Sequence, residues 1–431
     1  MKSSEYNLFL SIDGDRTIIF NSNTKRFFVS SNSCLTNYIE VINNPNLYAK
    51  NKQYQKLLST LSTNGFVIDD NVNELSEIER LYLKKRKSKE YSLMIMTTYA
   101  CNFSCWYCVQ NHENIYLESD TEQKIIEHIK HYLVSNNIEV FNIAWFGGEP
   151  LLNFNVICSI SEFAKKFCEE HNIRFSCSIT TNGVLLNSQI ISKMKQLNFI
   201  SFQITIDGVK QSHNLTKYNN AINDSFTLIL NNILELVNFI PNSLLTLRIN
   251  YTRKNLTTSL VDDIDNILKP VRNRIFILFR KVWQEPQDDS LFNAVSLCTH
   301  EFIKRGYTVN NDYDFTDFLS CYVEREHYMS VFPNGAVDRC NNKDIKKARG
   351  YLSDNGDVVW KSTPQELLLT VFSANSECRS CKYLPLCMGP CPAKREDLSK
   401  DDTLRCNVKN REEFFNRTVI DYCRIKSNYS L

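Results

Sequence analysis

Residues 91–108 read YSLMIMTTYACNFSCWYC, an apolar run that is followed at once by three cysteines. The first half, YSLMIMTT, has the length and apolar character of a buried strand. Cys101, Cys105 and Cys108 follow with the spacing C-x3-C-x2-C. Three thiolates this close together can bind three corners of one [4Fe–4S] cube and leave its fourth iron open to a small ligand. The same offsets also fit one face of a helix, so three core cysteines are the alternative at this point.

Similar strand-like runs recur downstream and alternate with helical patterns. They are EVFNIAWF (139–146), RFSCSIT (174–180), FISFQITI (199–206), LLTLRINY (244–251) and RIFILF (274–279). Such alternation indicates βαβ units and a parallel sheet. Six units predict a partial (β/α)6 barrel over residues 91–295, short of the eight units of a complete TIM barrel. Active sites of such barrels lie at the carboxyl ends of the strands, which is where the three cysteines stand.

Four short motifs accompany the next strands in order. They are GGEP (147–150) after the second strand, TTNG (180–183) at the end of the third, TIDG (205–208) at the end of the fourth and RINY (248–251) in the fifth. The two glycines of GGEP let backbone approach a ligand closely. Glu149 can accept a hydrogen bond from an ammonium group. Each motif alone is weak, but four in order at strand ends indicate a site.

Together these motifs resemble the radical S-adenosylmethionine (radical SAM) superfamily, including the aromatic Tyr107 before the last cysteine. The resemblance implies a [4Fe–4S] cluster held by Cys101, Cys105 and Cys108, and a bound SAM. Reductive cleavage of SAM to a 5′-deoxyadenosyl radical, which abstracts hydrogen from the substrate, is the expected chemistry. The resemblance also implies a set of SAM contacts: Gly147, Gly148, Glu149, Pro150, Asn182, Thr205, Asp207, Arg248 and Asn250.

Two positions depart from the family pattern. Thr205 stands where Ser is commoner, and Lys217, which follows His213, stands near the place of an Arg. That place bears on the contact with the SAM carboxylate. No residue is identified as a catalytic base.

A second set of cysteines occupies the C-terminal third: Cys321, Cys340, Cys378, Cys381, Cys387, Cys391 and Cys406. Their C-x2-C pair alone would suit zinc. The full order resembles the SPASM domain of radical SAM peptide modifiers, which carries two auxiliary [4Fe–4S] clusters. The resemblance implies one cluster on Cys378, Cys381, Cys387 and Cys406, and another on Cys321, Cys340 and Cys391.

The second auxiliary cluster has three cysteines for four irons. Its remaining iron is either open or held by an unidentified ligand, for which Cys298 is a candidate. The spacing of the other cysteines suggests no site, and they are expected to fill core space: Cys34, Cys158, Cys168, Cys177, Cys298 and Cys423.

The N-terminal residues 1–70 predict a small separate unit. Short strands are expected within 6–31, helices within 32–63 and a final strand at 66–68. The layout resembles the winged-helix-like recognition element of enzymes that modify ribosomally made peptides, which binds a leader peptide by strand addition. A plain accessory domain is the alternative. Residues 71–90 are expected to form a charged helical linker, and residues 296–431 the SPASM domain.

Charge and hydropathy exclude several classes of partner. The chain has 50 Lys+Arg against 48 Asp+Glu, so nothing favours nucleic acid or an anionic membrane. It has no secretory segment at its start and no apolar run long enough to span a bilayer. We therefore expect a cytoplasmic protein, in which clustered thiols bind metal rather than form disulfides.

These features predict an oxidoreductase that modifies a ribosomal precursor peptide, held by its leader at the N-terminal domain. An intramolecular crosslink (C–C, ether or thioether) is the expected product, and a flavodoxin or ferredoxin the expected electron donor. An anaerobic sulfatase-maturing enzyme is an alternative. Those enzymes carry Asp after the cysteine of a G-x4-C element, where this chain has Asn341. A non-enzymatic, zinc-stapled binding protein is the other alternative.

Overall fold

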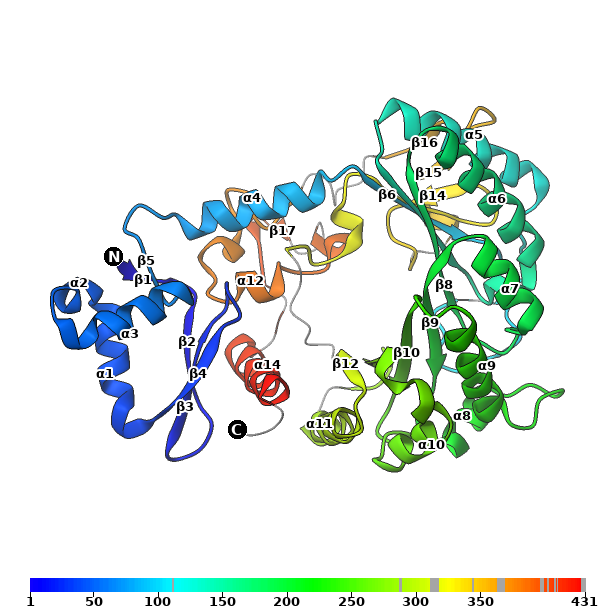
Figure 1. Cartoon of the computed structure of the whole chain (residues 1–431). Helices are drawn as coiled ribbons and strands as arrows, with labels where there is room; N and C mark the ends of the chain where they lie inside the picture. Colours follow the sequence, from blue (N-terminus) through cyan, green and yellow to red (C-terminus); the bar gives the residue numbers. More distant parts are fainter. Residues whose placement is uncertain are drawn as a thin grey trace. The chain divides into compact units, whose positions relative to one another are not determined.

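The computed structural model describes residues 1–431 except 111, 287–288, 311–317, 343–344, 363–368, 396–398, 401–402, 407, 409 and 428–431. The chain divides into two compact units (Figure 1). The first comprises Met1–Ser88, Tyr313–Glu326 and Gln365–Leu431, and the second comprises Lys89–Asp312 and His327–Pro364. The expected domain boundary at residue 296 does not coincide with this division, because 327–364 group with the barrel segment.

The second unit is built on one large, mostly parallel sheet. Its 11 strands run in the order β12-β11-β10-β9-β8-β7-β6-β13-β14-β15-β16. The six strands expected from the sequence form its parallel centre: β6 (Glu90–Met96), β7 (Val140–Phe146), β8 (Arg174–Thr181), β9 (Phe199–Ile206), β10 (Leu244–Tyr251) and β11 (Ile275–Lys281). The α/β fold with a parallel sheet is thereby confirmed.

Short strands extend this sheet at both edges. On one side β12 (Thr308–Asn310) pairs in parallel with β11. On the other, β13 (Tyr328–Val331) pairs in parallel with β6. An antiparallel meander continues from it through β14 (Ala336–Asp338), β15 (Gly350–Leu352) and β16 (Val358–Trp360).

Helices cover one face of the parallel strands (Figure 1). They are α5 (Ser119–Ser135), α6 (Phe154–Glu170), α7 (Ser188–Gln196), α8 (Lys210–Thr216), α9 (Ser225–Phe239), α10 (Ser259–Leu268) and α11 (Asp289–Lys304), with 3-10 turns η1 (Pro150–Asn153) and η2 (Lys269–Arg274). Strand β7 shows why this face is covered: Phe141, Ile143 and Trp145 alternate along it and are buried. The side chains between them are only half-buried, which leaves the other face of the sheet free to line a site.

The N-terminal part of the first unit is a three-stranded antiparallel sheet, in the order β2-β3-β4, with helices. Its elements are β1 (Lys2–Ser3), β2 (Asn7–Ser11), β3 (Arg16–Asn21), β4 (Phe27–Ser31), α1 (Asn32–Asn43), α2 (Pro45–Tyr48), α3 (Lys52–Thr63) and β5 (Val67–Ile68). The final strand, β5, pairs with β1 rather than with the main sheet. Helix α4 (Glu74–Arg86) occupies the expected linker.

The remainder of the first unit has little regular structure apart from one long helix. Its elements are η3 (Tyr322–Glu324), η6 (Glu377–Ser380), α12 (Leu384–Cys387), η7 (Pro392–Lys394), β17 (Ser399–Lys400), β18 (Thr403–Leu404) and α14 (Arg411–Lys426); η4 (Ile345–Lys347) lies in the second unit. Within the described ranges, no helix combines the length and apolar character needed to cross a membrane.

The N-terminal sheet of the first unit is buried on both faces. Ile19 packs with Val41 and Leu61 of the helices. Leu8, Leu10, Ile18 and Phe20 pack on the opposite face with residues of the C-terminal part, among them Tyr383, Phe415 and Val419. The alternation along β3 produces both contacts, because successive side chains point to opposite faces.

Candidate functional site

The three clustered cysteines lie in an irregular loop just past the end of β6. Residues 101–108 form no helix, and all three cysteines are half-buried rather than buried. The alternative of three core cysteines on one helix face is therefore wrong. Burial raises the pKa of the Cys101 thiol to about 11 and that of Cys105 to about 12. Iron binding has to displace these protons, because thiolates are the ligands.

The glycines of GGEP hold this cysteine loop against the end of β7. The amide of Gly148 donates to Thr98 O at 2.9 Å, and that of Glu149 donates to Ala100 O at 2.9 Å. A Cβ on Gly147 would lie 2.4 Å from Thr98 O, and one on Gly148 would lie 2.3 Å from Ala100 O. The close approach that requires glycine here is therefore between two backbone segments, not only between backbone and a ligand.

Glu149 joins the ends of β7 and β8. It is fully buried, and its carboxylate accepts from Thr181 Oγ1 at 2.7 Å, Asn182 N at 2.8 Å and Leu151 N at 3.1 Å. Burial raises its pKa, and these three donors oppose the rise. A carboxylate has about four acceptor sites, so one remains for a ligand. Pro150 begins η1 directly after it.

Asn182, at the end of β8, reaches the cysteine loop. Its Nδ2 donates to Asn102 Oδ1 at 2.6 Å and lies 3.9 Å from Cys101 Sγ. Asn219 holds the same loop from another side, by donating to Asn102 O at 2.9 Å. Asn182 belongs to the TTNG motif and was predicted, whereas Asn102 and Asn219 belong to no motif and were not.

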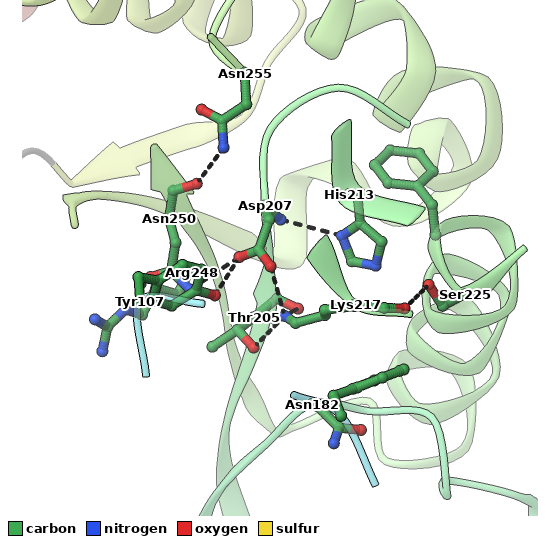
Figure 2. Close-up of polar contacts among 12 residues, drawn as sticks. Tyr107, Asn182, Thr205, Asp207, His213, Lys217, Ser225, Arg248, Asn250 and Asn255 are labelled. Atoms are coloured by element: carbon green, nitrogen blue, oxygen red, sulfur yellow. Dashed lines mark hydrogen bonds and ion pairs between the residues drawn. The ribbon is translucent and has the colours of Figure 1, made fainter. Parts of the chain in front are cut away.

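Asp207, at the end of β9, is the centre of a buried polar network (Figure 2). The Tyr107 hydroxyl donates to its Oδ1 at 2.6 Å, and Asn250 Nδ2 donates to the same oxygen at 3.1 Å. Burial and the adjacent carboxylate raise the pKa of Tyr107, so the phenol stays protonated. Arg248 Nε donates in turn to Asn250 Oδ1 at 2.9 Å. The structure thus brings the predicted residues of two strands onto the aromatic residue of the cysteine loop.

Lys217 places a buried positive charge in this network (Figure 2). Its ammonium donates to Thr205 O and Oγ1, both at 2.7 Å, and lies 3.7 Å from Asp207 Oδ2. Both members of this ion pair are buried. An ammonium has three N–H groups, so one is left after the two bonds to Thr205.

His213 fixes the turn that carries Asp207. The Asp207 amide donates to His213 Nδ1 at 3.1 Å, so the neutral ring carries its proton on Nε2. Burial and Lys217 lower the pKa of His213 well below its ordinary value. Within the described part of the chain, His213 Nε2 and Asp207 Oδ2 are buried without a hydrogen-bond partner.

These observations fit a zwitterionic ligand beside the cysteine loop. Lys217 offers a free N–H to a carboxylate, and Glu149 offers a free acceptor site to an ammonium. Asp207 Oδ2, which pairs with Lys217 but accepts no hydrogen bond, is a further acceptor. A SAM molecule carries both kinds of group.

His112 was not found from the sequence and lies against one of the three cysteines. Its Nε2 is 3.1 Å from Cys108 Sγ, and its backbone has a left-handed φ of 51°. Burial lowers the pKa of its imidazole. A single histidine four residues after a cysteine carries no recognisable pattern, which is why the sequence did not reveal it.

Four of the C-terminal cysteines line one pocket of the first unit. They are Cys378, Cys381, Cys387 and Cys406, the set that the sequence assigned to one cluster. No group of three or more His, Cys, Asp or Glu in the described ranges is arranged to hold a metal ion directly. A [4Fe–4S] cube takes one thiolate at each iron, so its ligands surround the cluster rather than meet at one point.

A buried arginine joins the two segments that carry Cys321 and Cys391. Arg395 donates to Ser320 Oγ at 3.1 Å and to Pro390 O at 3.3 Å, the residues that precede these two cysteines. Both cysteines belong to the first unit, whereas Cys340 belongs to the second. The pairing of Cys321 with Cys391 is thus compatible with the expected ligand set.

The remaining cysteines divide into three classes. Cys168, Cys177, Cys298 and Cys423 are buried, as expected of core residues, and Cys158 is half-buried. Cys34 is exposed, so its assignment to the core is wrong. Cys298 packs in the hydrophobic core of the barrel unit, which does not favour it as a cluster ligand. Asn341, at the position of the Asp of sulfatase-maturing enzymes, is buried. Asp344, the acidic residue three positions later, lies outside the described residues.

The class of protein follows from the fold, the cysteine loop and a match to known families. Residues 95–256 match the Radical SAM superfamily. That segment contains the cysteine loop and strands β7 to β10, so this part of the chain is a radical SAM domain; that superfamily uses a [4Fe–4S] cluster and SAM.

Two curated proteins are similar in sequence to this chain. It is 34% identical over 129 residues to uncharacterized protein MJ0907 of Methanocaldococcus jannaschii, a match over 30% of this chain and 43% of that protein. The chain therefore spans less than half the length of that relative. It is 23% identical over 384 residues to the radical SAM cyclopropyl synthase TigE of Paramaledivibacter caminithermalis, over 80% of this chain and 78% of that protein.

Solved structures share the fold. The structure of anSMEcpe with bound AdoMet has 17% identity and a TM-score of 0.57, and the match covers 78% of this chain and 97% of that one. Streptococcus suis SuiB bound to precursor peptide SuiA has 16% identity and a TM-score of 0.50, over 94% and 100% of the two chains. At such identities the likeness shows the fold alone.

Proposed function

We propose that this protein is a radical SAM peptide maturase that forms an intramolecular bond in a ribosomally made precursor peptide. The observation that carries the proposal is the match to a cyclopropyl synthase over 384 residues, which reaches far beyond the barrel. A cyclopropane requires a new carbon–carbon bond. That similarity therefore favours the C–C form over an ether or thioether.

The barrel residues would bind and orient SAM. Cys101, Cys105 and Cys108 would hold a [4Fe–4S] cluster, which supplies the electron for homolysis of the SAM sulfonium bond. Lys217 would pair through its third N–H with the SAM carboxylate, and Glu149 would accept from its amino group. Asp207, Asn250 and Tyr107 keep this end of the sheet rigid through their mutual hydrogen bonds.

The SPASM cysteines would hold two auxiliary clusters. Cys378, Cys381, Cys387 and Cys406 line one pocket and would saturate one cube. Cys321, Cys340 and Cys391 would hold the other. An electron donor of flavodoxin or ferredoxin type would reduce the protein.

The N-terminal domain would bind the leader of the precursor. Its sheet has the order β2-β3-β4, so among the described strands β2 and β4 each present one edge to which a peptide strand can add. The fold of peptide-bound SuiB covers 94% of this chain, so this unit falls within the likeness.

Metal analysis and a peptide assay test the proposal together. Anaerobically reconstituted protein should hold about 12 iron and 12 sulfide per chain, which is the content of three cubes. With SAM, a reductant and the precursor, 5′-deoxyadenosine should form, and the peptide should lose two hydrogen atoms per new bond. Zinc without sulfide would overturn the assignment as an enzyme. SAM cleavage that converts a cysteine or serine of a sulfatase peptide to formylglycine would favour the sulfatase-maturing alternative instead.

A further inference from the structure

The pocket that contains four cysteines also contains one arginine. Arg411 lines it together with Cys378, Cys381, Cys387 and Cys406. The other residues that line the pocket are Leu384, Gly389, Pro390, Val408 and Phe415, all uncharged. Arg411 is therefore the cationic group of this lining.

Arg411 is held at this position by the helix that it begins. It is the first residue of α14, so the positive end of the helix dipole adds to its charge. Phe415, one turn later, is buried and packs in the core with Tyr383. Arg411 lines the same pocket as Cys381 and Cys406. Glu377 accepts a hydrogen bond from the Cys406 amide at 3.1 Å, so an acidic group lies next to one of the four cysteines.

A cation at this place has a definite effect on a cube with four thiolate ligands. Such a cube is negatively charged, and its reduction adds one more negative charge. A nearby positive charge and N–H···S hydrogen bonds stabilise the reduced form more than the oxidised form, which raises the reduction potential. The other lining residues, being uncharged, offer no comparable compensation.

We propose that Arg411 sets the reduction potential of the cluster bound by these four cysteines, by offsetting its negative charge. The proposal rests on the assignment of this cluster under the proposed function. Arg411 would act on electron transfer through its charge, and it has no proposed contact with the peptide.

The test uses the full chain with Cys101, Cys105 and Cys108 changed to Ala, so that only the auxiliary clusters remain. Their potentials are measured by an EPR-monitored redox titration. Arg411→Gln should lower one of the two midpoint potentials and leave the other unchanged. Arg411→Lys, which keeps the charge, should recover most of the shift. Because Arg411 is exposed, the difference in midpoint potential between wild type and Arg411→Gln should shrink as the salt concentration is raised.

The matched control is Arg424→Gln, at the far end of the same helix. It removes the same charge 13 residues away, about 20 Å along an α-helix. It should leave both potentials unchanged. If Arg411→Gln retains its iron and leaves both potentials where they are, the proposal on Arg411 is wrong. If Arg411→Gln loses iron, Arg411→Lys decides: a potential close to that of wild type supports the proposal, and a shift with full iron overturns it.

Iron content separates this result from the proposed function. The background variant should hold about 8 iron and 8 sulfide per chain. A content near zero would refute the auxiliary clusters themselves, and with them both proposals. A content of about 8 with unshifted potentials would refute the role of Arg411 alone.

Discussion

Arg395 Nη1 lies 2.6 Å from Glu324 Oε1, and neither side chain of this ion pair has exposed surface. Ser320 N and Oγ both donate to the other oxygen, Glu324 Oε2, at 2.8 Å. Tyr82 of helix α4 donates to Oε1 at 3.1 Å. The pair therefore joins three segments of the first unit that lie far apart in sequence.

Breaking this pair from one side should destabilise the unit strongly. Arg395→Met leaves a buried carboxylate without its cation, which costs about 3–5 kcal/mol of unfolding free energy. Replacing both residues, Glu324→Leu with Arg395→Met, should recover much of the loss. Urea unfolding measures both variants. The exposed pair of Lys382 and Glu412, 3.0 Å apart, is the control: Glu412→Gln should change stability by less than about 1 kcal/mol. An equal effect at both pairs would contradict the importance of burial.

Gly148→Ala should disrupt the cysteine loop. The added methyl would lie 2.3 Å from Ala100 O, so the backbone that leads to Cys101 has to move. We expect a loss of about 1–3 kcal/mol from overpacking, together with less iron on the first cluster. Thermal unfolding and iron analysis measure these effects. Gly14→Ala is the control, because a methyl added there would meet no atom within 4 Å, and it should change neither quantity.

Lys217→Gln should weaken the binding of SAM. It removes the charge near Asp207 while keeping a hydrogen-bond donor for Thr205. A hydrogen bond to a charged group is worth about 1.5–3 kcal/mol, so the dissociation constant should rise about 10- to 150-fold. Equilibrium dialysis of reconstituted protein with SAM provides the value. The control Lys210→Gln removes a lysine from an exposed ion pair with Asp224 and should leave the dissociation constant of SAM unchanged. Unaltered affinity in Lys217→Gln would refute the proposed carboxylate contact.

Because His128 is buried and neutral, the second unit should be less stable in mild acid than at neutral pH. Its Nδ1 lies 2.9 Å from Gly356 O and its Nε2 2.8 Å from the Tyr91 hydroxyl, so the ring is held neutral. Burial lowers the pKa of His128 from 6.5 to about 4. The unfolded chain therefore binds a proton between these values and the folded chain does not. Protonation of His128 in the unfolded chain therefore has no effect on the unfolding free energy well above pH 6.5. It lowers this free energy by about 3 kcal/mol as the pH drops to 4.

Denaturant unfolding at pH 7 and pH 5 checks this expectation. The wild type should lose more stability between the two than His128→Gln does. Tyr91→Phe is the matched control, because it removes the hydroxyl and keeps the histidine. It should be less stable at both values and retain the pH dependence. Equal slopes in wild type and His128→Gln would show that other groups cause the acid sensitivity.

The strands and the clustered cysteines were predictable because their signals are local. Six apolar runs became the six central strands, and three cysteines within eight residues share one loop. The pairing of Arg395 with Glu324 was not predictable, because 71 residues separate them and neither belongs to a motif. The addition of β13 to the edge of the sheet beside β6 depends on a similar long-range contact.

The motifs predicted which residues meet at one end of the sheet better than they predicted the contacts of each residue. The glycines of GGEP were expected to make room for a ligand, but they also pack against Thr98 and Ala100. Lys217 appeared only as a departure from a family pattern, and the structure makes it a buried cation beside Asp207. Such roles depend on three-dimensional partners, which spacing along the chain does not contain.

The two-sided burial of the N-terminal sheet has a consequence for synthesis in the cell. Leu8 and Phe20 are covered by Phe415 and Val419, which the ribosome adds about 400 residues later. At roughly 5–20 residues per second, that interval is on the order of 20–80 s. Throughout this time an apolar face of the nascent sheet is uncovered, so the growing chain should be a client of chaperones that shield hydrophobic surface. Under the proposed function, the sheet that binds the leader would be fully packed only after the segment with the C-terminal cysteines has been made.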